Sequence, residues 1–249
     1  MGKASKTASS YEPRRTFDKG TLTDRVYQNL REDILSNRLL PETPLHEASI
    51  ASALEVSRGP VREALRRLDA EGLVSVIPRR GAMVSSLSRE EFLDAYRVRE
   101  SLEMLAVRLA TPNLSQEDLD QLYRLHEEML EHASAEDVDA FFETNTAFHA
   151  TVVDRSDNRI LQGIYHPLIN QMRRYRVSSM SLRGGLDRSC EEHAQILQAM
   201  QDGEAEQAAQ LLRAHIQVPL RTLENDHEAV LVPRLQSTDQ DDHAEGRPS

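Results

Sequence analysis

The 249-residue sequence predicts a mostly α-helical protein in two parts, with a β-hairpin at the end of the first part. Along most of the chain, apolar residues recur every three or four positions, as they do on the buried face of a helix. Short alternating segments at 74–76 and 82–84 flank a basic turn at 78–81, which predicts two paired strands. No segment from 88 to 226 alternates as a strand does, so the second part is predicted to be all-helical.

Composition excludes several classes of protein. No run of 18 apolar residues exists, which excludes a transmembrane helix. Residues 1–10 lack the apolar core of a secretory signal. The single cysteine, Cys190, cannot form an internal disulfide, which is typical of a reducing compartment. We therefore predict a cytoplasmic protein with no membrane partner.

The net charge of −11 is unevenly distributed along the chain. Residues 1–20 carry five Lys/Arg against two acids, and residues 21–87 carry nine against nine. Residues 88–226 carry fourteen against twenty-five, and residues 227–249 carry two against five. An acidic total is thus compatible with a nucleic-acid-binding module near the N-terminus. Residues 1–20 are predicted to be a mobile basic arm, and residues 227–249 an acidic flexible tail.

The first part, residues 21–87, is predicted to contain three helices before its hairpin. A helix from Thr23 to about residue 35 ends at a segment with two prolines, and a short helix covers 47–54. After a tight turn, Ser57 caps a third helix that ends at Gly72, with Pro60 in its first turn. Three helices followed by a hairpin form the winged helix-turn-helix arrangement.

The second part, residues 88–226, is predicted to be a helical bundle. Ser88 with Glu91, and Ser115 with Asp118, match the capping box that begins a helix. Turn signals separate the remaining helices. The predicted helices lie near residues 88–110, 115–133, 137–155, 158–180, 186–202 and 204–225.

The third helix carries an arginine face suited to DNA. Arg58, Arg62 and Arg66 recur at four-residue spacing, opposite an apolar face. Arginine can read guanine in the major groove and grip phosphates. The alternative is a solvated face with local ion pairs, such as Glu63 with Arg67. The hairpin favours DNA binding, because Arg79 and Arg80 at its tip could reach the minor groove or the backbone.

The same residues carry a family resemblance. The stretch from 22 to 86 resembles the DNA-binding domain of the GntR family of bacterial transcription regulators, and VSRGPVREALRRLDAEGLV resembles its FadR-type branch. By this resemblance Ser57, Arg58 and Arg62 contact bases and phosphates, with Gly81 at the wing. The family often has an arginine where Ala48 stands, so operator half-sites cannot be borrowed from relatives.

Three histidines and an asparagine of the second part form a pattern. Asn145 and His149 lie at i and i+4, so they share one helix face. His193 precedes the Gly203 turn by ten residues, and His215 follows it by twelve, which places both roughly 15–18 Å from the turn on antiparallel helices. Their convergence would suit a divalent metal, most plausibly zinc, with nickel or manganese as alternatives. Alternatively, each histidine is a hydrogen-bonded interhelical residue.

Residues 88–224 resemble the FCD ligand-binding domain that accompanies this type of GntR module. The resemblance rests on Arg99-Glu100-Ser101-Leu102-Glu103, Asn145-Thr-Ala-Phe-His149, Glu192-His193 and Ala214-His215-Ile216. In many members the first metal ligand is Asp, where this chain has Asn145. The resemblance implies a small organic acid as effector, with Arg99 as the first candidate to bind it. Arg173 and Tyr175 are predicted to lie on a helix lining the same cavity.

Together these observations predict a homodimeric, ligand-responsive transcription regulator and not an enzyme. Two winged helices would bind double-stranded operator DNA at an inverted repeat, and the effector would release a repressor. The alternative is a metal-dependent enzyme acting on a small organic acid. A third reading is an architectural DNA-binding protein. The sequence lacks the usual catalytic signatures: residues 126–130 fail the zinc-protease spacing, and no Gly-x-Ser-x-Gly segment exists.

Overall fold

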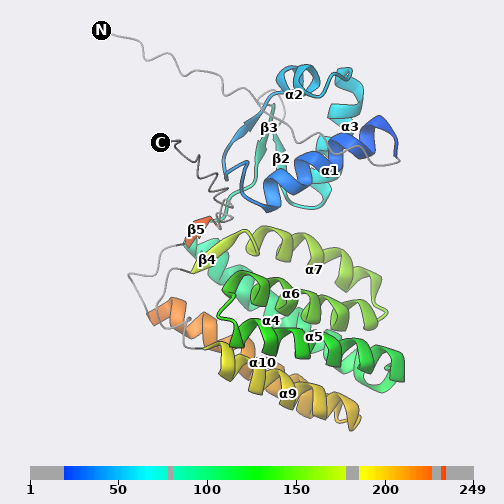
Figure 1. The fold of residues 1–249 in the computed structure, drawn as a ribbon, viewed down its shortest axis with the longest axis vertical. Coiled ribbons are helices and arrows are strands. Elements are labelled where there is room, and N and C mark those ends of the chain that lie inside the picture. The colour runs from blue at the N-terminus through cyan, green and yellow to red at the C-terminus, as the bar shows by residue number, and fades with distance from the viewer. Residues whose placement is uncertain (1–19, 78–80, 178–184, 226–230, 234–249) are drawn as a thin grey trace, which may run out of the picture.

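The N-terminal part of the computed structural model has three helices and a small sheet (Figure 1). The structure describes residues 20–77, 81–177, 185–225 and 231–233. The elements are α1 (Leu22–Leu35), β1 (Pro44–Leu45), α2 (Glu47–Ala53), α3 (Arg58–Ala70), β2 (Val74–Ile77) and β3 (Gly81–Val84). The antiparallel sheet has the order β1-β3-β2, so the winged helix-turn-helix prediction is confirmed. The additional strand, β1, was not predicted.

Local signals account for the helix ends in this part. Thr21, and not Thr23, caps α1 through a reciprocal capping box with Asp24. Helix α3 ends as predicted, since Gly72 follows its last turn with a φ of 71° that favours glycine. Apolar residues from all three helices and the hairpin then form one buried core, in which Leu30 and Leu68 are fully buried. This core holds α3 with its apolar face inward.

The C-terminal part is a bundle in which α4 and α10 lie side by side (Figure 1). The capping boxes at Ser88 and Ser115 form as predicted. Its elements are α4 (Arg89–Ala110), a 3₁₀ turn (Thr111–Asn113), α5 (Gln116–Ser134), α6 (Val138–Arg155), α7 (Arg159–Met172), β4 (Tyr175–Val177), α9 (Leu186–Gln201), α10 (Ala205–Asn225) and β5 (Leu231–Pro233). The mostly helical fold class is confirmed, and no helix of the described residues is long and apolar enough to cross a bilayer.

The prediction of an exclusively helical second part is wrong at one place. Helix α7 ends at Met172 instead of continuing to residue 180, and β4 pairs with β5 in antiparallel register, Arg176 opposite Val232. Tyr-Arg-Val and Leu-Val-Pro contain aromatic and β-branched residues that favour strands. The prediction that residues 227–249 form a loose tail is therefore wrong for residues 231–233. The rest of that tail, and residues 1–19 of the predicted arm, lie outside the described residues.

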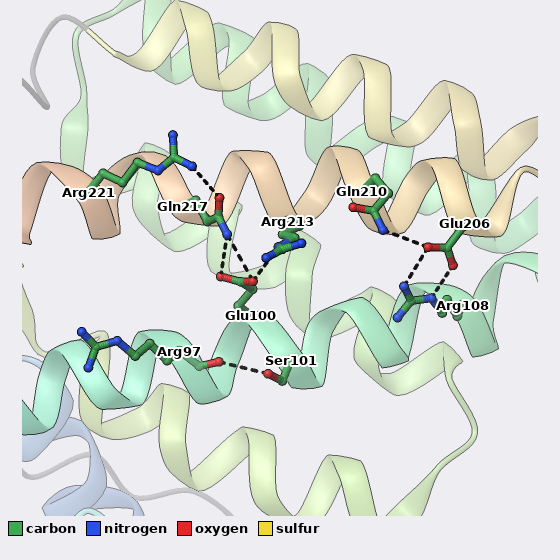
Figure 2. Close-up of polar contacts among 9 residues, drawn as sticks. All are labelled: Arg97, Glu100, Ser101, Arg108, Glu206, Gln210, Arg213, Gln217 and Arg221. Atoms are coloured by element: carbon green, nitrogen blue, oxygen red, sulfur yellow. Dashed lines mark hydrogen bonds and ion pairs between the residues drawn. The ribbon is translucent and has the colours of Figure 1, made fainter.

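Polar contacts join the first and last helices of the bundle (Figure 2). Arg108 donates two hydrogen bonds to Glu206, at 2.6 and 2.9 Å. Glu100 accepts a 2.9 Å bond from Arg213 and longer bonds from Gln217. Exposed pairs of this kind contribute little to stability, because water screens their charges. They connect α4 to α10 at several points along the two helices.

The two parts contact each other through the segment that follows α7. The side-chain amide of Asn37 donates to the carbonyl of Arg174 at 2.8 Å. The guanidinium of Arg174, in a fully buried residue, donates to the carbonyl of Ser85 at 2.8 Å. Gly72 lies directly against this region, because a Cβ at its position would meet the Gln171 side chain at 2.5 Å. The junction is thus closely packed and hydrogen-bonded.

Candidate functional site

Three histidines from three helices meet inside the bundle. They are His149 of α6, His193 of α9 and His215 of α10, and one ring nitrogen of each lies within 4.8 Å of the others. The ring centroids of His193 and His215 are 4.4 Å apart, as antiparallel packing of α9 and α10 led us to expect. His149 and His193 are almost completely buried, and the His215 side chain is 11% exposed. The cluster therefore opens towards solvent on the His215 side only slightly.

An oxygen atom lies at the Nδ1 atom of each of the three rings. Nδ1 of His193 lies 2.7 Å from the carbonyl of Ser189, and Nδ1 of His215 lies 2.7 Å from Oε2 of Glu192. Nδ1 of His149 lies 2.7 Å from Oε2 of Glu103, at an ion-pair distance without good hydrogen-bond alignment. These oxygens favour the tautomer with the proton on Nδ1, which leaves the electron pair of Nε2 available to a metal ion. The Nε2 atoms of His149 and His193 are 3.2 Å apart.

Two of the histidine rings, those of His149 and His193, are held in their neutral form. Burial lowers the pKa of His149, although the nearby Glu103 carboxylate opposes this effect. Burial, with the neighbouring His215 and His149, lowers the pKa of His193 well below its usual range. Neutral imidazole is the form that binds a metal ion. The burial, tautomers and convergence of this nitrogen set therefore fit a divalent metal.

Glu103 is a functional candidate to which the sequence analysis gave no role. Its Oε1 accepts a 2.6 Å bond from Nε of Arg99 and a 3.0 Å bond from the hydroxyl of Tyr165. Burial alone would raise the pKa of Glu103, but the charge of Arg99, its hydrogen bond and the adjacent His149 ring outweigh burial and hold the pKa well below its usual range. Glu103 is thus a buried anion between Arg99 and the histidine cluster. Its spacing of four residues from Arg99 was the available signal.

The other predicted site residues of the helical part have different surroundings. Asn145 is half-buried on α6, one turn before His149, and its side chain makes no hydrogen bond within the described part of the chain. Arg99 lies beside the cluster, joined to it through Glu103, and its side chain is 14% exposed. Buried Arg99 keeps its charge: burial lowers the pKa of Arg99, but Glu103 together with Tyr165 and Tyr96 raises it by more.

The prediction that Arg173 and Tyr175 share one helix is wrong. Arg173 is the cap residue that directly follows α7, and Tyr175 begins β4, with a side chain outside the described parts. Arg173 donates to Glu143 and lines a cavity at the junction of the two parts. None of the three clustered histidines lines that cavity. The helix ends at Met172, three residues before Tyr175, so the two residues do not follow a common helical face.

On α3, the apolar and arginine faces separate as the sequence indicates. Val61 and Leu68 are fully buried, whereas Arg58, Arg62 and Arg66 are exposed. Such a helix has one face for packing and another for a partner. Arg58 has no hydrogen bond or ion pair within the described residues.

Two of these arginines have acidic neighbours. Arg62 makes two bonds to Glu47 of α2, at 3.1 and 2.9 Å, and Arg66 lies 3.7 Å from Glu63. The proposed pairing of Glu63 with Arg67 does not form, because Arg67 reaches across to Asp24 of α1 at 2.8 Å. Exposed pairs are weak enough to be exchanged for phosphate contacts.

The wing is described at only one of its predicted contact residues. Gly81 begins β3 with a φ of 92°, a conformation that favours glycine at the end of the hairpin turn. Arg79 and Arg80 lie outside the described residues. Ser57 occupies the cap position of α3, but its hydroxyl makes no capping bond and the residue is exposed. A free hydroxyl at this helix end is compatible with a contact to phosphate.

The fold and the site define a winged-helix protein with a separate helical domain that encloses a histidine cluster. Comparison with known proteins agrees with this class. Residues 22–84 match the bacterial regulatory proteins of the gntR family, and residues 94–218 match the FCD domain. The chain belongs to the GntR family and carries an FCD domain.

Similar proteins are transcription regulators by name. The repressor RspR of Escherichia coli K12 is 26% identical over 79% of this chain and 86% of its own length. The gluconate operon repressor of Bacillus subtilis is 30% identical over 69% of this chain and 70% of its own length. Among solved structures, E. coli McbR/YncC has a TM-score of 0.64 at 25% identity, covering 82% of this chain and 98% of that one.

Proposed function

We propose that this protein is a transcriptional repressor whose helical domain binds a divalent metal and a small organic acid. The observation that carries the proposal is the arrangement of the three histidines. An oxygen accompanies Nδ1 of each ring, and three imidazoles converge in a buried site. A set of satisfied structural histidines would not require this convergence.

His149, His193 and His215 would hold the metal, with the amide oxygen of Asn145 as a further ligand. Three imidazoles suit zinc, and nickel or manganese are alternatives. When bound, the metal supplies open coordination positions for a carboxylate. Because Asn145 is neutral, the site has less negative charge than one with an aspartate at this position.

Arg99 is the residue that would hold a second oxygen of the acid. Its guanidinium already donates to Glu103 through Nε, which orients it and fixes its position. The negative charge of Glu103 also offsets the positive charge of Arg99, so the acid would be attracted chiefly by the metal. The name of the B. subtilis relative, which controls a gluconate operon, is in keeping with a hydroxy acid as effector.

The N-terminal part would bind operator DNA as one half of a homodimer. The proposed boundaries are 21–87 for this part and 88–226 for the helical part. Two copies related by a twofold axis would read an inverted repeat. The residues proposed to contact DNA are Ser57, Arg58, Arg62, Arg66, Arg79, Arg80 and Gly81. Binding of the acid would favour a dimer arrangement that fits the operator less well.

Arg58→Ala should weaken operator binding by about 1–3 kcal/mol, because an exposed arginine at the start of α3 is placed to read a base edge. The measurement is a titration of DNA from the promoter of the gene that encodes this protein with each variant, at one fixed salt concentration. Arg124→Ala is the matched control, since Arg124 is exposed on α5 and has no bonded partner among the described residues. Equal affinity of the Arg58 variant and the control would contradict the proposed interface.

A thermal-shift screen of small organic acids tests the effector site without knowledge of the promoter. A ligand that binds the folded state raises the free energy of unfolding by mass action, by about 2.7 kcal/mol at a hundredfold excess over its Kd, and so raises Tm. We expect an acid that stabilises the zinc-loaded protein and not the chelator-stripped protein. Acids that stabilise both forms equally would place the effector elsewhere. Turnover of the stabilising acid would favour the alternative of a metal-dependent enzyme.

A further inference from the structure

The cavity that Arg173 lines is separate from the histidine cluster and lies at the junction of the two parts. Its volume is about 410 Å³, within the range of small-molecule sites. Tyr27, Arg31 and Glu71 line it from the winged helix, and residues of α6 and α7 line it from the bundle. A molecule in this cavity would therefore touch both parts of the protein.

Basic side chains enter the cavity from opposite sides. Arg31 belongs to α1, and Arg173 is the cap residue that directly follows α7. Arg31 lies 3.1 Å from Glu71, which also accepts from the hydroxyl of Tyr27, and Arg173 is paired with Glu143. Glu71 lines the cavity and Glu143 does not, so the lining residues include two guanidinium groups and one carboxylate. Their formal charges sum to +1, although each guanidinium also has its own acidic neighbour.

Asn170 provides a polar group whose bonding capacity is unused. It is half-buried on α7 and lines the cavity, and its side chain makes no hydrogen bond with any described residue. A half-buried amide without a partner is better satisfied by a ligand than by the protein alone. The remaining walls include the half-buried side chains of Ala150 and Pro167 and the largely buried side chain of Ile169, which offer apolar surface.

We propose that this cavity binds a small carboxylate with an apolar body, independently of any metal. The carboxylate would lie between Arg31 and Arg173 and accept a bond from the Asn170 amide. The apolar body would pack against Ala150, Pro167 and Ile169. Planar carboxylates suit guanidinium groups, which donate in a fixed fork. This site goes beyond the proposed effector site, which depends on the histidines.

The position of the cavity gives its occupant influence over the junction. Arg173 directly precedes Arg174, which bonds Ser85 of the winged helix. Tyr165 forms one wall of the cavity and donates to Glu103, the neighbour of His149. A ligand that bridges α1 and α7 favours the arrangement of the two parts in which it can contact both helices at once. By linkage, any state with a different junction binds it less well.

Isothermal titration of benzoate into the full-length protein tests this inference. The protein is first stripped of metal with a chelator, so that the histidine cluster cannot hold benzoate through an ion. We expect saturable binding with a Kd at or below about 1 mM. Asn170→Ala and Arg173→Ala should each weaken binding at least about tenfold, which corresponds to the loss of one hydrogen bond to a charged group.

Two further variants keep the result specific. His193→Ala and Arg124→Ala should bind benzoate as the unaltered protein does, because neither residue lines the cavity. Arg31→Gln gives a second way to remove a cation if Arg173→Ala lowers Tm without ligand. Absence of saturable binding, or binding lost in His193→Ala and kept in Asn170→Ala, would overturn the proposal. The proposed metal site would be unaffected by that result, since it is tested on metal-loaded protein.

Discussion

Replacing His193 by alanine is expected to lower zinc affinity by more than about 100-fold. Loss of an outer residue that orients a ligand costs about 10–100-fold, and the loss of a ligand itself should cost more. His193 is the most enclosed of the three rings, with its Nε2 3.2 Å from that of His149 and its Nδ1 at the Ser189 carbonyl. The measurement is competition for zinc against a chelator of known affinity, together with the metal content of purified protein.

His46→Ala is the control for this experiment, because His46 is exposed in the N-terminal part, where it precedes α2. We expect operator binding without effector to be largely unchanged in His193→Ala, since the winged helix has its own core. Unchanged zinc affinity would exclude His193 as a ligand. Loss of folding and of DNA binding in the metal-free variant would make the cluster structural.

Replacing Glu103 by alanine is expected to destabilise the metal-free protein by about 3–5 kcal/mol. Removal of one partner of a buried ion pair leaves the other charge without compensation. Here that charge belongs to Arg99, whose side chain is 14% exposed, and the Tyr165 hydroxyl also loses its acceptor. For a chain of this length the loss corresponds to roughly 6–20 °C in Tm. Thermal unfolding followed by circular dichroism measures it.

A surface pair gives the comparison. Glu206→Ala breaks an ion pair with Arg108 in which the glutamate side chain is 67% exposed, and it should leave Tm nearly unchanged because water screens the two charges. Replacing both members of the buried pair, as in Arg99→Met with Glu103→Leu, should recover much of the lost stability, because no charge is then left alone. Equal effects of Glu103→Ala and Glu206→Ala would show that the buried network contributes little.

Much of the fold follows from local signals. The starts of α4 and α5 depend on a serine and an acid three residues later, and the end of α3 depends on Gly72. The approach of His193 to His215 could also be predicted, because a regular helix rise fixes how far each lies from the Gly203 turn. These features need only information within a helix or a helical hairpin.

Features that depend on distant segments could not be predicted in the same way. Strands β1, β4 and β5 have two or three residues each, too few for an alternating pattern, and each is defined by a partner elsewhere. The importance of Glu103 depends on burial between α4, α6 and α7. An acid four residues after an arginine looks like an exposed helix pair until the packing is known. The cavity beside Arg173 likewise exists only where the two parts meet.

The β4–β5 pairing has a topological consequence for the helical part. The strands join residues 175–177 to residues 231–233, and α9 and α10 lie between them in the chain. The β4–β5 pairing therefore brings together the two ends of the segment that contains α9 and α10. A segment held at both ends in this way tends to open as one cooperative unit. Two of the three histidines belong to this unit, whereas His149 belongs to α6. An ion bound by all three histidines would link this unit to the rest of the bundle. Opening of the unit and release of the ion would then be one event.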